Sequence, residues 1–86
     1  MIHKIYTVYD TKAEAFLPPF FMHKEGMALR IFQECLENEE HQFGKHPEDY
    51  TLFYAGEFDD NLGTITQEKL ESVAPGITLV KPEENK

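Results

Sequence analysis

A single stretch of the chain, Lys24 to Asn38, carries its apolar residues at helical spacing. They fall at i, i+1, i+4, i+5, i+8 and i+9 and form one broad stripe of Met27, Ala28, Ile31, Phe32, Cys35 and Leu36. No Ser, Thr, Asp or Asn immediately precedes the segment, so the helix depends on docking this stripe rather than on an N-terminal cap. A chain with one helix must build the rest of its core from strands.

Two segments rich in β-branched and aromatic residues predict the main strands. Lys4 to Tyr9, KIYTVY, has apolar residues on both faces, which is typical of a central strand and leaves open which face is the core. Tyr50 to Phe58, YTLFYAGEF, is the strongest β signal in the chain.

Shorter extended segments complete two hairpins. Ala13 to Met22 follows a turn at Asp10, and its Pro18-Pro19 pair lacks two amide donors, so this strand should lie at an edge or break there. A surface connection with a turn starting at Pro47 leads from the helix to the strand Tyr50 to Phe58. After that strand we expect a turn at Asp59 to Gly63, a fourth strand at Thr64 to Thr66 and a short strand at Ile77 to Val80.

We therefore predict a single α+β domain over residues 1–80, in the order strand, strand, helix, strand, strand, with one helix packed on an antiparallel sheet. Residues 81–86 are expected to form a disordered tail. One helix covers only one face of such a sheet. The other face predicts a homodimer or larger assembly, unless the segment Leu70 to Val80 folds back over it.

Charge is unevenly distributed along the chain. The formal net charge is −8. From Met1 to Gln33 there are four basic and three acidic residues, whereas from Glu34 onward there are four basic and thirteen acidic residues. Affinity for phosphates comes largely from Lys and Arg, so any anion-binding surface should lie on the N-terminal third. The single Cys35 and the absence of a long apolar run fit a cytoplasmic protein without a membrane span.

The residues that could carry catalysis do not form a known arrangement, so we expect no enzyme and no cofactor. Cys35 lies on the apolar stripe, and Ser72, the only serine, is outside any nucleophile motif. The cluster of His41, His46, Glu48 and Asp49 lacks the tight His and Cys spacing of structural zinc sites. We interpret that cluster as a solvated turn rather than a metal site.

Single-stranded nucleic acid is bound by a few cations together with aromatic faces that stack on bases. The less acidic third of the chain supplies both residue types, namely Lys4, Tyr6, Lys12, Phe20, Phe21, Lys24 and Arg30. The alternative is that these aromatic residues are core and that the lysines merely flank strands.

Two parts of the sequence resemble the small non-structural protein of microviruses of the gokushovirus type, which are tailless phages with circular single-stranded DNA. They are FGKHPEDYTLFYAGEFDD, from Phe43 to Asp60, and KIYTVYDTKAEAFLPPFF followed by a helix containing GMALRIF. The resemblance covers Met1 to Thr66. It implies a phage protein that binds DNA or takes part in replication inside the infected bacterium and that has no catalytic motif. The matching motif has no assigned chemical role and consists of Lys45, His46, Pro47, Glu48, Asp49 and Tyr50.

The sequence thus supports a non-enzymatic phage accessory protein that acts in replication or packaging in the host cytoplasm. It would bind single-stranded DNA weakly through the N-terminal aromatic and basic residues. The alternative is a protein–protein adaptor whose acidic surface docks on a basic replication or capsid protein. A mimic of DNA also fits the acidity, with no positional support beyond charge.

Overall fold

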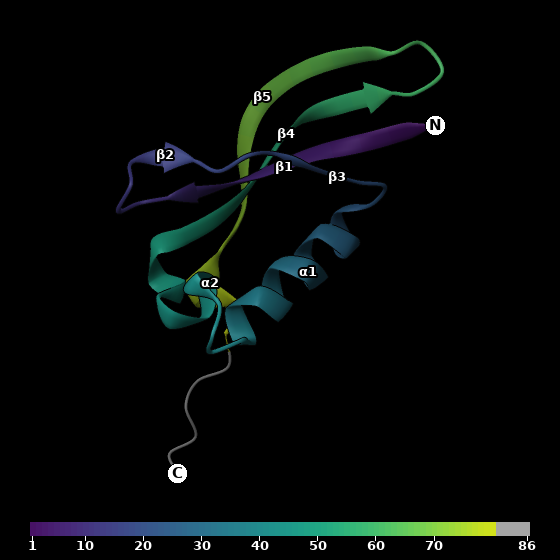
Figure 1. Cartoon of the computed structure of the whole chain (residues 1–86). Coiled ribbons are helices and arrows are strands. Elements are labelled where there is room, and N and C mark those ends of the chain that lie inside the picture. The colour runs from purple at the N-terminus through teal and green to yellow at the C-terminus, as the bar shows by residue number, and fades with distance from the viewer. Residues whose placement is uncertain (81–86) are drawn as a thin grey trace.

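The computed structural model, which describes residues 1–80, places two helices against one side of a curved sheet (Figure 1). The tail expected at residues 81–86 lies outside the described residues. The main elements are β1 (Ile2–Asp10), β2 (Ala15–Phe16), β3 (Phe20–Met22), α1 (Glu25–Glu37), α2 (Gln42–Lys45), β4 (Tyr50–Asp59) and β5 (Thr64–Pro75). Two 3-10 turns, η1 (Pro47–Asp49) and η2 (Gly76–Thr78), precede β4 and follow β5.

Every strand pair in the sheet is antiparallel, and the spatial order is β2-β1-β4-β5, with β3 also paired to β1. β2 and β3 occupy successive parts of the same edge of β1, where Phe16 lies opposite Tyr9 and Phe21 lies opposite Ile5. Pro18-Pro19 separates them, as their missing amide donors predict. The α+β class, the central position of the first strand and the broken second strand are confirmed.

β-bulges bend β4 where it pairs with its two neighbours. The register shifts between Ile5 and Tyr6 on one side and between Tyr54 and Gly56 on the other. Gly56 allows the backbone of β5 to come close, because a Cβ at this position would lie 2.3 Å from the carbonyl oxygen of Thr66. The bulges account for the curl of the β4–β5 hairpin, since an extra residue bends a strand and increases its twist (Figure 1).

The predicted helix packs its stripe against one face of the sheet. Ala28, Phe32 and Leu36 are buried, whereas Met27 and Ile31 at the margins of the stripe are 46% and 40% exposed. As the sequence indicated, no side chain caps the N-terminus of α1. The core that the helix covers consists of Tyr6, Val8, Ala28, Phe32, Leu36, Phe43, Tyr50 and Leu52.

The connection from α1 to β4 contains a helix that the sequence did not predict. The Nδ1 atom of His41 accepts a hydrogen bond from the Phe43 amide at 3.0 Å and so caps α2. Phe43 is buried against Phe32 and Tyr50, with ring centroids 5.7 and 4.4 Å away. A helix of one turn is formed here by tertiary packing and not by its own propensity.

The C-terminal third departs from the prediction in two ways. The expected strand Thr64 to Thr66 is only the beginning of β5, which continues to Pro75. The strand expected at Ile77 to Val80 is wrong, because this segment forms η2 and then packs Leu79 and Val80 against the core. Pro75 and Gly76 turn the chain out of the sheet at this point. Gly76 lies close to the backbone of η1, because a Cβ at this position would lie 2.6 Å from the carbonyl oxygen of Pro47.

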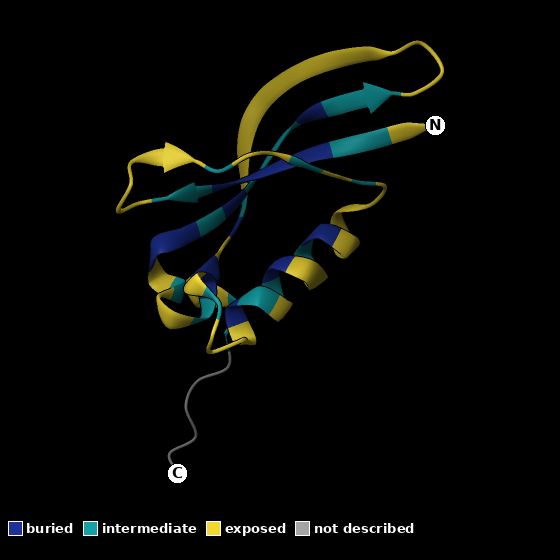
Figure 2. Cartoon of the chain, viewed as in Figure 1, coloured by how far each residue is buried: buried dark blue, intermediate teal, exposed yellow. Residues whose placement is uncertain are grey.

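The two faces of the sheet differ in what covers them. Tyr6 and Val8 of β1 belong to the core under the helices, whereas Ile5 and Thr7 point to the opposite face. The alternative that Leu70 to Val80 folds back over this opposite face is wrong, because Leu79 and Val80 join the helix side. Within residues 1–80 no helix lies over the opposite face, although Ile5 and Thr7 at its centre are buried, and Figure 2 shows most of β5 exposed.

Tyr6 brings a hydroxyl group into the core without a hydrogen-bond partner among the described residues. Burial, aided by Glu25 and Tyr54, raises the pKa of this hydroxyl to about 12. We expect Tyr6→Phe to increase the free energy of unfolding by about 1 kcal/mol, because phenylalanine keeps the ring and removes an unpaired polar group. Urea denaturation followed by circular dichroism measures the change.

The control is Thr7→Val on the same strand. Thr7 is also buried, but its hydroxyl donates a hydrogen bond to the Leu17 carbonyl oxygen at 2.7 Å. This substitution should lower the free energy of unfolding by about 1 kcal/mol. If both substitutions destabilise the protein equally, the Tyr6 hydroxyl has a partner in solution and the prediction fails.

Candidate functional site

The aromatic residues predicted to stack on nucleic acid divide between the core and the surface. Tyr6 is 0% exposed, and Phe20 packs beside it on the helix side with ring centroids 6.1 Å apart. Tyr6 offers no ring face to a base in this fold, whereas Phe20 is only partly buried and lines a hollow between α1 and the β2–β3 segment. Phe21 points to the opposite face and is 46% exposed.

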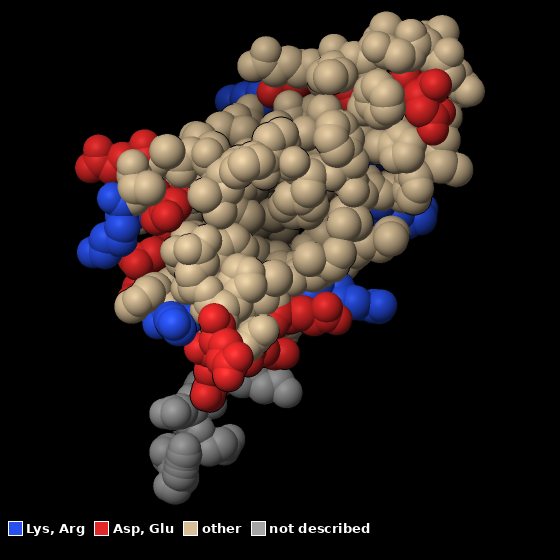
Figure 3. Space-filling view, in the orientation of Figure 1, with Lys and Arg blue, Asp and Glu red and all other residues tan. Residues whose placement is uncertain are grey.

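The four predicted cations lie on three different parts of the fold, namely β1, the β1–β2 turn and α1. Lys4 is half-buried on β1 opposite Met22, whereas Lys12 is exposed in the β1–β2 turn. Lys24 is exposed at the N-terminus of α1, and Arg30 is exposed in its middle. Figure 3 shows Lys and Arg at separate places around one face, interspersed with acidic side chains, around an uncharged and hollowed centre. A single chain therefore does not bring these cations into one basic groove.

The face of the sheet that points away from the helices carries two groups of aromatic rings. Phe16 contacts Tyr9 and Phe53, with ring centroids 4.8 and 5.4 Å away. Towards the other end of β1, the Phe58 ring lies 5.9 Å from Phe21 and 5.8 Å from His3. We call this surface the aromatic face, and its rings are Tyr9, Phe16, Phe21, Phe53 and Phe58.

An apolar groove of about 500 Å³ runs along the aromatic face. Its walls come from β1, the β2–β3 segment, β4 and β5, and its apolar lining includes Ile5, Phe16, Leu17, Phe21, Ile65 and Leu70. Among the described residues, Glu68 is the only charged one in its lining. A second hollow of about 190 Å³ lies between α1 and the β2–β3 segment and is lined by core side chains, including Cys35, where burial raises the pKa of the thiol.

Sequence reasoning did not identify most of the aromatic face. The sequence predicts a strand that contains Phe53 and Phe58 but does not indicate that their rings are on the surface. It predicts no strand that contains Leu70. The available signal was the alternation of Ile5, Thr7 and Tyr9, which share a face. That face could be recognised as exposed only after the helix had been placed on the other one.

The matching motif forms the entry to β4. His46 ends α2, Pro47 begins η1, and the Asp49 amide donates to the His46 carbonyl oxygen at 3.0 Å. The Asp49 carbonyl oxygen in turn accepts a hydrogen bond from the Thr11 amide at 2.9 Å, which joins this turn to the end of β1. Lys45 is exposed at the end of α2, whereas Tyr50 is buried in the core.

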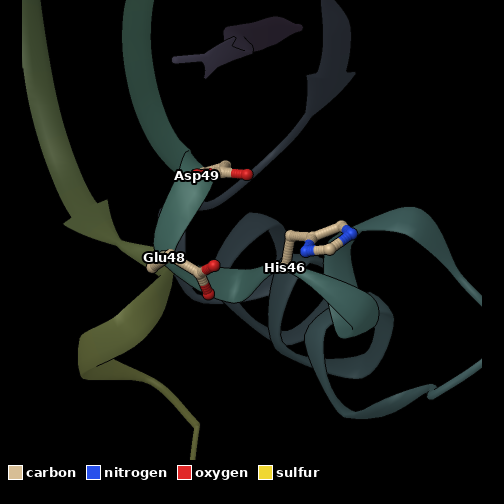
Figure 4. A group of neighbouring side chains, drawn as sticks. All are labelled: His46, Glu48 and Asp49. Atoms are coloured by element: carbon tan, nitrogen blue, oxygen red, sulfur yellow. The ribbon is translucent and has the colours of Figure 1, made fainter. Parts of the chain in front are cut away.

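Side chains of this motif converge at one place. Ligand-type atoms of His46, Glu48 and Asp49 all lie within 4.8 Å of one another (Figure 4). His46 and Glu48 are exposed, whereas Asp49 is buried. Burial, with the nearby carboxylates of Asp10 and Asp49, raises the pKa of the Tyr50 hydroxyl, which indicates a concentration of negative charge at this point. His41, which the sequence grouped with these residues, instead caps α2.

None of the helices in the described part of the chain is long and apolar enough to cross a membrane. Comparison with known proteins finds a family that spans nearly the whole chain. A family model described as Phage ORF5 protein matches residues 3–79, which include almost all of the sheet and both helices. No curated protein and no solved structure matches the chain.

Proposed function

The chain belongs to the Phage ORF5 protein family, and from this premise we propose that it is a non-enzymatic accessory protein that binds single-stranded DNA. In this proposal the phage has a single-stranded DNA genome, because the sequence resembles small proteins of gokushovirus-type microviruses. The protein then acts in the cytoplasm of the infected bacterium during genome replication or packaging.

The observation that carries the proposal is the exposure of the aromatic face. Phe16 and Phe21 are 45% and 46% exposed on the sheet surface that faces away from the helices. Stacking of bases on aromatic side chains supplies sequence-independent affinity for single strands, and sheet surfaces carry such rings in several single-strand-binding folds. The groove between the rings gives unstacked bases an apolar site.

Electrostatics make this binding weak. Lys12 lies in the turn that leads to β2, beside the Phe16 end of the aromatic face, but Glu68 lines the groove itself. With two or three phosphate contacts, log K should fall with log salt with a slope of about −1.4 to −2.1. We propose that copies of the chain associate, because linked sites raise the affinity of weak modules, and sedimentation of the free protein reports their number.

The direct test is fluorescence anisotropy of a labelled oligothymidylate at low salt with the wild type and with Phe16→Ala and Phe21→Ala. Each substitution should weaken binding roughly 5- to 150-fold, which is the usual contribution of stacking on one base. The matched control is Ile77→Ala, because Ile77 is 53% exposed on η2, outside the groove lining. Equal affinities for all four proteins would exclude the aromatic face as the binding surface.

A second candidate function is the acidic adaptor, and one observation favours it: no Lys or Arg of residues 1–80 lines the groove. Glu37, Glu39 and Glu40 are exposed at and after the end of α1, where they can attract a basic replication or capsid protein. Absence of any anisotropy change with wild-type protein at low salt would favour the adaptor over the DNA-binding protein.

A further inference from the structure

Asp49 is the buried carboxylate of the motif turn. It is 8% exposed, and no described residue donates a hydrogen bond to its carboxylate oxygens. The ion pairs within residues 1–80 are those that Asp60 makes with the Met1 amino group and with His3, so Asp49 has no basic partner either. Its carboxylate oxygens are not fully enclosed, because the buried side-chain polar atom without a partner in residues 1–80 is the Tyr6 hydroxyl oxygen, so an ion can still reach Asp49.

A cation can contact Asp49 at one place, because its carboxylate lies near two other ligand-type side chains. His46 and Glu48 contribute an imidazole nitrogen and a carboxylate oxygen, and all three donor atoms lie within 4.8 Å of one another. Figure 4 shows the three side chains around a common space beside η1. Since His46 and Glu48 are exposed, a cation can reach this space from solvent.

We propose that His46, Glu48 and Asp49 form a binding site for a divalent first-row metal ion, either Zn²⁺ or Mn²⁺. Both ions accept an imidazole nitrogen together with carboxylate oxygens, whereas Mg²⁺ and Ca²⁺ prefer oxygen ligands alone. Three protein ligands leave at least one coordination position for water.

The backbone around the site determines what the bound ion does. His46 belongs to the end of α2, while Asp49 leads directly into β4 and is bonded through its carbonyl oxygen to Thr11. An ion held by both side chains links the short helix to the strand and to the end of β1. The site therefore stabilises the entry to β4 and does not depend on the aromatic face.

The test starts from full-length protein freed of metal with EDTA and dialysed. Addition of Zn²⁺ or Mn²⁺ should bind one ion per chain in calorimetry and raise the melting temperature by roughly 5 °C or more at saturation. Mg²⁺ at the same concentration should give no comparable shift. If neither Zn²⁺ nor Mn²⁺ changes the melting temperature, the site does not exist.

Variants separate this site from adventitious surface binding. His46→Ala and Glu48→Gln change exposed side chains, so both proteins should fold and lose the metal-dependent shift, whereas Glu40→Gln, which changes an exposed carboxylate outside the cluster, should keep it. Asp49→Asn should raise the melting temperature of the metal-free protein, because it removes a negative charge within 4.8 Å of the Glu48 carboxylate, and should abolish the shift. An undiminished shift in His46→Ala, or a less stable metal-free Asp49→Asn, would overturn the proposal.

Discussion

Replacing Phe32 with alanine is expected to lower the free energy of unfolding by about 3–5 kcal/mol, which is the usual cost of removing a large aromatic side chain from a core. Phe32 is 2% exposed and sits between the sheet and the short helix, with its ring edge-on to Phe43. A domain of this size has a total stability of about 5–15 kcal/mol, so the loss is a large part of it. Urea denaturation of both proteins measures the difference.

The control for this prediction is Ile31→Ala, one position earlier on the same helix. Ile31 is 40% exposed, so its truncation should cost less than about 1.5 kcal/mol. A loss for Ile31 as large as that for Phe32 would mean that α1 docks on the sheet in a different rotation about its axis.

The second large effect is expected for Gly44→Ala, with a loss of about 3 kcal/mol. A Cβ at Gly44 would lie 1.9 Å from the carbonyl oxygen of Asn38 and 3.2 Å from that of Cys35. Both are backbone atoms, so the methyl group can be accommodated only if α2 moves away from the end of α1. Phe43 then loses its place in the core, which thermal denaturation and near-ultraviolet circular dichroism both detect.

Gly26→Ala is the matched control, because the same methyl group is added to a helical glycine with no atom within 4 Å of its Cβ position. Alanine should stabilise α1 by about 0.5–1 kcal/mol, since glycine loses more backbone entropy in a helix. The two substitutions are therefore expected to have opposite signs. A Gly44→Ala protein as stable as the wild type would contradict the close approach of α2 to Asn38.

Local patterns were sufficient where an element packs one regular face. The stripe from Met27 to Leu36 located α1, and Pro18-Pro19 located the break between β2 and β3. Gly63 marked the hairpin turn, where its φ of +70° suits glycine. β5 was mostly missed because its residues from Thr64 to Ser72 are exposed on an edge strand and carry little apolar alternation. Such a strand is specified by its pairing with β4, which the sequence does not display.

The aromatic face and the motif turn could likewise be predicted only in part from the sequence. β1 is apolar on both faces, so its own alternation could not decide whether Tyr6 or Thr7 faced the helix. That choice also determines the orientation of Phe20 and Phe21, because these residues pair with Tyr6 and Ile5. The motif turn was visible as a group of His, Glu and Asp residues. The burial of Asp49, which sets it apart from the exposed His46 and Glu48, appears only when β1 and β4 are brought together.

The pairing of β1 with β4 also governs how this chain reaches its folded state. Ile2 lies opposite Asp59 and Asp10 opposite Tyr50, so every contact of this pair closes a long loop that contains α1 and α2. During synthesis the first strand leaves the ribosome well before its main partner exists, with only β2 and β3 available on its other edge. The sheet therefore assembles late and comparatively slowly. Until then the apolar residues on both faces of β1 stay accessible to chaperones and to other nascent chains.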